Sequence, residues 1–112
     1  MAEATPKQLN EYLTSDGRSP FIEWLNKIRD ARARARIRVR LDRLSLGNFG
    51  DCKSIGGSIH ELRLDYGPGY RIYFAQYGDQ IILLLWGGTK RTQQQDIQLA
   101  QEYWGDFRSR VS

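Results

Sequence analysis

Residues 59–86 read IHELRLDYGPGYRIYFAQYGDQIILLLW, and this segment predicts consecutive antiparallel β-strands. The first strand covers 59–65, where successive side chains alternate between two faces. One face carries Ile59, Glu61 and Arg63, and the presumed core face carries His60, Leu62 and Leu64. Gly67-Pro68-Gly69 is a strong loop signal. The second strand, 70–77, is rich in aromatic and β-branched residues.

The third strand, 81–86, is apolar on both faces, which is typical of a strand in the middle of a covered sheet. Gly78-Asp79 fits a two-residue hairpin turn before it, and Gly87-Gly88 is expected to end it. Short strands are also expected at 52–55 and, with less support from the pattern, within 8–13. The segment therefore predicts a meander of three or four strands with a possible N-terminal strand.

Two helices flank this sheet in the sequence. Ser19 is a good N-cap and Pro20 suits a first helical position, so a helix is predicted over about 20–28. Thr92 is expected to cap a C-terminal helix, in which apolar residues recur at helical spacing. These residues are Ile97, Ala100, Trp104 and Phe107.

The segment 31–41 alternates alanine or aliphatic residues with arginine, a period that by itself indicates a strand. Helix is favoured because alanine and arginine are strong helix formers and the apolar spacing continues to Leu44. Gly47 supplies a C-terminal stop. On this helix Ala33, Ile37, Leu41 and Leu44 form the core-facing stripe, and the neighbouring stripe holds Arg29, Arg32, Arg36, Arg40 and Arg43.

The order of elements predicts an α+β fold, with two N-terminal helices, an antiparallel sheet and a C-terminal helix. A length of 112 residues corresponds to one domain spanning 1–112. The hydrophobic content of 40% excludes a disordered chain, and no apolar run approaches the ~20 residues of a membrane span. The single cysteine excludes a metal site built from several thiolates, and the N-terminal residues do not resemble a secretory signal. We therefore expect a cytoplasmic protein without metal or cofactor.

The net charge of +4 is unevenly distributed. Between positions 27 and 43 there are eight basic and two acidic residues, a net of +6, so the remainder of the chain carries −2. Three interpretations of this basic helix remain open. The first is that the helix binds RNA phosphates, the second that it binds an acidic or amphipathic protein segment, and the third that it is only a solvated helix face.

Residues 61–74, ELRLDYGPGYRIYF, resemble toxins of bacterial type II toxin–antitoxin modules, the RelE/ParE superfamily. A second similar region is Gly87-Gly88-Thr89-Lys90, followed by Gln94-Gln95-Asp96-Ile97. The branch that looks most similar is that of the HigB-like addiction module killer proteins, and the similarity covers roughly 15–107. Because one fold hosts several toxic mechanisms, this resemblance is more specific for the superfamily than for the activity.

The resemblance implies a toxin that forms a hetero-oligomer with a cognate antitoxin, often a helix-turn-helix protein. RelE-like and HigB-like members cut mRNA on the ribosome without a metal, whereas ParE-like members inhibit DNA gyrase. The sequence departs from nuclease members that carry a catalytic Tyr or His near the C-terminus, because the spacing of Tyr103 and Trp104 indicates core positions. A metal-independent mRNA endonuclease is the favoured expectation. A gyrase inhibitor and a decayed toxin that only binds its antitoxin are the alternatives.

Metal-free RNA cleavage requires cations that stabilise the phosphorane-like transition state and protonate the leaving oxygen. By resemblance, Arg63, Arg71 and Lys90 occupy positions where RelE-like toxins carry functional basic residues. If the hairpin pairs Asp65 with Gly69, the two arginines share a face; if it pairs Asp65 with Tyr70, they face opposite ways. Further RNA contacts are expected from Lys53, Tyr73, Arg91, Arg32, Arg36 and Arg40.

The single histidine, His60, is a tempting general base. Its alternation with Leu62 and Leu64 favours a packed or peripheral side chain instead. For Tyr73 sheet packing is likewise favoured over a base-stacking role, although RNA binding would use such a ring. The sequence therefore leaves the identity of a general base open.

Overall fold

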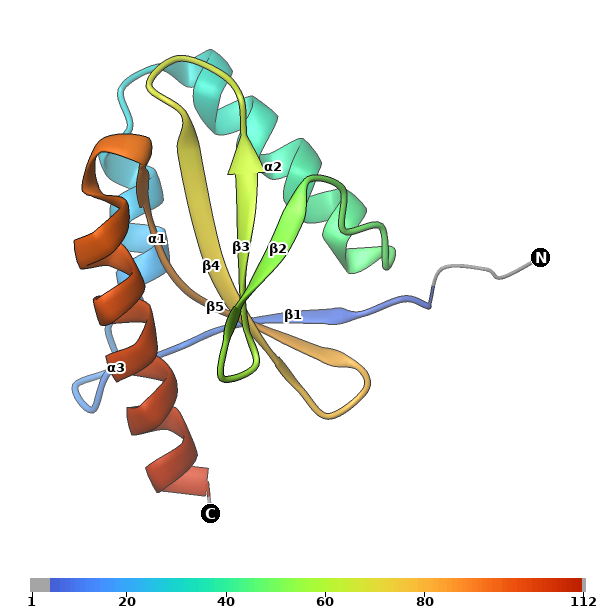
Figure 1. The fold of residues 1–112 in the computed structure, drawn as a ribbon, viewed down its shortest axis with the longest axis vertical. Coiled ribbons are helices and arrows are strands. Elements are labelled where there is room, and N and C mark those ends of the chain that lie inside the picture. Colours follow the sequence, from blue (N-terminus) through green and yellow to red (C-terminus); the bar gives the residue numbers. More distant parts are fainter. Residues whose placement is uncertain (1–4, 112) are drawn as a thin grey trace.

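The computed structural model describes residues 5–111 and has the predicted α+β fold (Figure 1). Its five-stranded sheet has the order β1-β5-β4-β3-β2. These strands are β1 (Gln8–Glu11), β2 (Cys52–Gly56), β3 (Ile59–Leu64), β4 (Tyr70–Tyr77) and β5 (Ile81–Thr89). The strand expected within 8–13 is confirmed, and it pairs in parallel with β5 while the other neighbours are antiparallel. The sheet is therefore mixed, which the meander alone did not predict.

The N-terminal helices begin at the expected kind of cap. α1 (Pro20–Lys27) starts after Ser19, whose hydroxyl accepts a hydrogen bond from the Ile22 amide at 3.2 Å. α2 (Ala31–Ser45) starts after Asp30, whose carboxylate accepts from the Arg32 amide at 2.9 Å. The helical interpretation of the basic segment is thus confirmed. Arg29 precedes the N-cap, so it lies outside the helical arginine stripe.

Each face of the sheet buries its own core, and the helices divide between the two faces (Figure 1). On one face α1 and α2 supply Phe21, Leu25, Ala33, Ile37 and Leu44, which pack on alternate residues of β3, β4 and β5. On the other face α3 (Gln93–Val111) packs Ala100 and Trp104 against Ile59, Tyr73 and Ala75, among others. Successive side chains of β3 alternate between the two faces, so Leu62 and Leu64 point toward α2 and Ile59 points toward α3.

Two expectations about β5 are wrong. Tyr77 pairs with Ile81, so the turn contains three residues, 78–80, not the two of Gly78-Asp79. The strand also continues through Gly87 and Gly88 to Thr89. The glycines are there because neighbours occupy the space of a side chain: a Cβ on Gly87 would lie 2.2 Å from the Trp24 ring, and one on Gly88 1.8 Å from Asp96 Oδ2.

The C-terminal helix is preceded by one turn of 3₁₀ helix, η1 (Lys90–Thr92). Thr92 therefore does not cap α3 as expected; its hydroxyl donates to Asp96 Oδ2 at 2.5 Å. The other oxygen of the buried Asp96 accepts from Trp86 Nε1 at 2.8 Å. These bonds fix η1 to β5. No helix within residues 5–111 combines the length and the apolar character needed to cross a membrane.

Candidate functional site

The strand register places two arginines side by side. β3 pairs with β4 such that Arg63 lies opposite Arg71, the register that also aligns Asp65 with Gly69. Of the two registers left open by the sequence, this is the one that puts both guanidiniums on one face, the face that α3 covers. Two guanidiniums on one face of adjacent strands are suited to binding a phosphate.

Lys90 joins the two arginines because the β3–β4 turn contacts the end of β5. The Lys90 amide donates to the Gly69 carbonyl at 2.7 Å. Gly69 adopts a φ of +79°, which favours glycine, and a Cβ there would lie 3.4 Å from Lys90 Cβ. This close approach positions η1 beside the β3–β4 hairpin.

The three residues predicted as catalytic line one cleft of about 210 Å³. Cations outnumber carboxylates in its wall by three to two, and the full lining is Asp51, Arg63, Asp65, Gly69, Arg71 and Lys90. Arg71 is largely buried, with 12% of its side chain exposed, whereas Arg63 retains 34% and Lys90 is exposed. The cleft therefore offers one fixed guanidinium and two more accessible cations.

A buried carboxylate, Glu61, is hydrogen-bonded to Arg63 and forms a looser ion pair with Arg71. Its side chain is 0% exposed. Glu61 Oε1 accepts a hydrogen bond from Arg63 Nε at 3.2 Å and lies 4.0 Å from Arg71 Nε. Glu61 Oε2 accepts from the Tyr73 hydroxyl at 3.1 Å and from Gln93 Nε2 at 2.8 Å. Glu61 thus connects β3, β4 and the first turn of α3 beneath the cleft.

These contacts determine the protonation states below the cleft. Burial opposes ionisation of Glu61, but hydrogen bonds from Gln93, Tyr73 and Arg63 outweigh it and hold its pKa below the ordinary value. Burial, and then the charge of Glu61, raise the pKa of Tyr73 far above its ordinary value. Glu61 is therefore an anion and Tyr73 a neutral phenol at neutral pH. Neither is placed to take a proton from a ligand, since both are fully buried.

One polar atom in this network lacks a partner. Within residues 5–111, Arg71 Nε is buried without a hydrogen-bond acceptor, because Glu61 Oε1 is too distant at 4.0 Å. An Arg71 Nη1 atom donates to the Tyr70 carbonyl at 3.2 Å. A buried, incompletely satisfied guanidinium facing a cleft is suited to an anionic ligand.

The other predicted RNA contacts separate into different surroundings. Lys53 is exposed and lies opposite Glu61 in the β2–β3 register, so it borders the network. Arg91 is exposed beside Lys90, in an adjoining hollow of about 420 Å³ formed with residues 92–95. Tyr73 is fully buried against Glu61. The expectation that its ring contacts RNA is therefore wrong.

The arginines of α2 lie away from this cleft, over the other face of the sheet. Arg32 is exposed in the first turn. The Arg36 guanidinium lies 4.5 Å from the centre of the Tyr66 ring. Arg40 Nη1 donates to the Arg63 carbonyl at 2.7 Å, so this side chain braces the strand that carries a cleft residue.

His60 is excluded from the cleft. Its ring stacks on Phe74 at 5.3 Å on the face that α2 covers, and burial lowers its pKa. Tyr103, at the C-terminal position considered for a catalytic residue, stacks on Tyr12 at 4.9 Å. The interpretation of both as packing residues is confirmed.

Sequence reasoning missed the role of Glu61 and the contribution of Gln93. Alternation did place Glu61 on the same face as Arg63, and an acidic residue inside an apolar strand is a signal for a buried ion pair. Gln93 lies 32 residues from Glu61 in the chain, and no local pattern joins them. Within residues 5–111, no three His, Cys, Asp or Glu side chains cluster as metal ligands would.

Comparison with known proteins gives one clear relationship. No protein-family model matches the sequence. The chain is 47% identical over 81 residues to an uncharacterized protein of Haemophilus influenzae, an alignment that covers 72% of this chain and 82% of the relative. Identity at this level over most of both chains is sufficient to establish common descent. The chain therefore belongs to the same family as this Haemophilus influenzae protein.

Proposed function

We propose that the protein is the toxin of a type II toxin–antitoxin module of the RelE/ParE superfamily, in its HigB-like branch, and that it cleaves mRNA on the ribosome without a metal. The observation that carries the proposal is the meeting of Arg63, Arg71 and Lys90 around one cleft of about 210 Å³. Its sequence around the hairpin and around Lys90 resembles that superfamily. A cytoplasmic location and a hetero-oligomer with a helix-turn-helix antitoxin belong to the same proposal.

The cleft offers the groups that this chemistry needs. The ribose 2′-oxygen attacks the adjacent phosphorus while the bond to the 5′-oxygen breaks, which leaves a 2′,3′-cyclic phosphate and a 5′-hydroxyl. Arg63 and Arg71 bind the non-bridging oxygens as negative charge develops on them. The Lys90 ammonium donates a proton to the departing 5′-oxygen. The 2′-hydroxyl proton passes to a rim carboxylate, Asp51 or Asp65, since these are the acceptor side chains in the described lining.

Growth arrest after induced expression tests this assignment. Arg71→Ala and Lys90→Ala are expected to abolish arrest, because each removes a cation from the cleft. Arg38→Ala and Lys27→Ala are the matched controls, since both residues are exposed and lie outside the cleft lining. Circular dichroism must show that all four variants are folded. If both cleft variants stay fully toxic, these residues do not form the active site.

One observation favours a non-enzymatic alternative, a ParE-like inhibitor of DNA gyrase. The described cleft lining contains neither a histidine nor an accessible tyrosine, and the two rim carboxylates are solvent-exposed. A supercoiling assay with purified gyrase separates the two functions. Inhibition at stoichiometric protein, with intact mRNA in cells, would favour the gyrase inhibitor. Expression without arrest and without gyrase inhibition would indicate a decayed toxin that retains only antitoxin binding.

A further inference from the structure

The outer surface of α2 carries an unusually concentrated positive charge. The helix holds six arginines and one aspartate between Ala31 and Ser45, a net of +5. Within residues 5–111, no arginine of α2 lies within 4 Å of a carboxylate oxygen; the ion pairs there involve Arg18, Arg63, Arg71 and Arg110. Asp30 interacts electrostatically with Arg32 at the start of the helix, but in the described fold no α2 arginine forms a salt bridge with a carboxylate.

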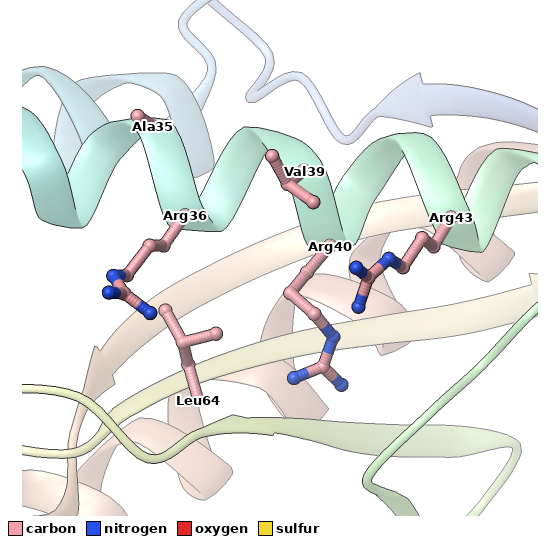
Figure 2. Close-up of a pocket in the computed structure, with 6 residues that line it drawn as sticks. All are labelled: Ala35, Arg36, Val39, Arg40, Arg43 and Leu64. Atoms are coloured by element: carbon pink, nitrogen blue, oxygen red, sulfur yellow. The ribbon is translucent and has the colours of Figure 1, made fainter.

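A hollow of about 410 Å³ lies along this helix, between α2 and the end of β3 (Figure 2). Arg36, Arg40 and Arg43 extend from one side of the helix, spaced i, i+4 and i+7, and Leu64 rises from β3 between Arg36 and Arg40. Ala35 and Val39 form an adjacent apolar row. Val39 is 47% exposed, which is high for an aliphatic side chain. We call this surface the α2 groove.

Two of the groove arginines are held in place before any ligand binds. Arg36 lies over the Tyr66 ring at 4.5 Å, and the Tyr66 hydroxyl in turn donates to Asp30 Oδ2 at 3.1 Å. Arg40 Nη1 donates to the Arg63 carbonyl at 2.7 Å. Side chains ordered in advance lose less conformational entropy when they bind. The groove therefore has the preorganised charge that a binding surface needs.

From this arrangement we infer that the α2 groove binds an acidic, amphipathic protein segment. Its carboxylates pair with Arg36, Arg40 and Arg43, and an aliphatic side chain packs on Val39 and Leu64. The three arginines span about 10 Å along the helix, since each residue rises 1.5 Å, so a partner helix would present acids at the same i, i+4, i+7 spacing. RNA would also pair with arginines, but its phosphates would gain nothing from exposed Val39. The inference goes beyond the proposed activity, because no residue that lines the groove also lines the cleft and because binding in the groove requires no RNA cleavage.

The test uses two fluorescent peptides of about four helical turns and equal composition. One places leucines and glutamates on a single helical face; in the other their order is shuffled. A single-stranded RNA of mixed sequence is the third probe, and fluorescence anisotropy gives each dissociation constant. The amphipathic peptide is expected to bind the full-length protein about tenfold more tightly than the shuffled one.

Variants then locate the binding. Arg36→Glu/Arg43→Glu should weaken the amphipathic peptide by about tenfold or more, whereas Arg29→Glu/Arg38→Glu, with the same charge change outside the groove, should weaken it much less. Val39→Ser should also weaken the peptide and leave RNA affinity unchanged. Equal affinity for both peptides, equal losses in the two double variants, or tight RNA binding lost only in Arg36→Glu/Arg43→Glu would each overturn the inference.

Discussion

Glu61→Gln is the substitution that most directly probes the network under the cleft. The change keeps the shape of the side chain but removes its charge and replaces one oxygen acceptor with an amide donor. The Gln side chain is unable to accept the three hydrogen bonds from Arg63, Tyr73 and Gln93 that Glu61 accepts now. Arg71, with 12% of its side chain exposed, loses the anion that balances its charge.

The structure sets the size of the effect. Breaking a fully buried ion pair costs about 3–5 kcal/mol, but Arg63 keeps 34% of its side chain in solvent, which reduces the loss. We expect the free energy of unfolding to fall by about 2–3 kcal/mol at pH 7. For a domain of this size the melting temperature should drop by roughly 10 °C.

The pH dependence gives a sharper test. The pKa of Glu61 is held below its ordinary value of 4.5, so its contribution to stability is full above that value and is lost as pH falls through the lowered pKa. Urea unfolding of wild type and Glu61→Gln should therefore show a constant difference above about pH 5 that shrinks in acid. Glu102→Gln, on the exposed face of α3, is the matched control and should change stability little. A Glu61→Gln variant as stable as wild type, or a difference independent of pH, would contradict this reasoning.

Three further predictions concern other parts of the molecule. Gly88→Ala should lower the free energy of unfolding by about 3 kcal/mol, because its Cβ would lie 1.8 Å from Asp96 Oδ2. Gly105→Ala, whose Cβ would have nothing within 4 Å, should be neutral or stabilising. Chemical denaturation measures both variants, and equal effects would refute the steric argument. Burial and Asp106 raise the pKa of Tyr12 to about 12, so the difference in ultraviolet absorbance between wild type and Tyr12→Phe should titrate near pH 12. Asp106→Asn should lower that midpoint, because it removes the carboxylate that accepts the Tyr12 hydrogen bond. Titration of Tyr12 near pH 10 in the folded protein would contradict this contact between Tyr12 and Asp106. Burial raises the pKa of the Cys52 thiol to about 11, so at neutral pH this thiol should react with a disulfide reagent about a hundredfold more slowly than a free thiol. A reaction rate equal to that of the urea-unfolded chain would show that the thiol is not protected.

Local signals in the sequence predicted most of the fold. Ser19 and Pro20 marked the start of α1, and the apolar spacing of Ile37 and Leu44 identified α2 as a helix despite the alternation of its arginines. Features that depend on distant residues were not predictable in the same way. The glycines at 87 and 88 looked like a strand end, yet they lie within β5 because Trp24 and Asp96 pack against the backbone there.

The candidate site shows the same division. The basic residues at 63, 71 and 90 are apparent from the sequence, but two strand registers are compatible with it, and only one of them places both arginines on one face. The turn at Gly69 settled this register and also brought Lys90 to the cleft. The burial of Tyr73 and the contact between Glu61 and Gln93 follow from the docking of α3 on the sheet, which local patterns do not specify.

Mapping of mRNA 5′ ends by primer extension after brief induced expression tests the central proposal most directly. We predict new, ribosome-dependent cleavage ends within coding sequences for the wild type. These ends should be absent for Arg71→Ala and present at wild-type level for Arg38→Ala. Intact mRNA in cells that nevertheless stop growing, or undiminished cleavage by folded Arg71→Ala, would contradict the assignment of RNA cleavage to this cleft.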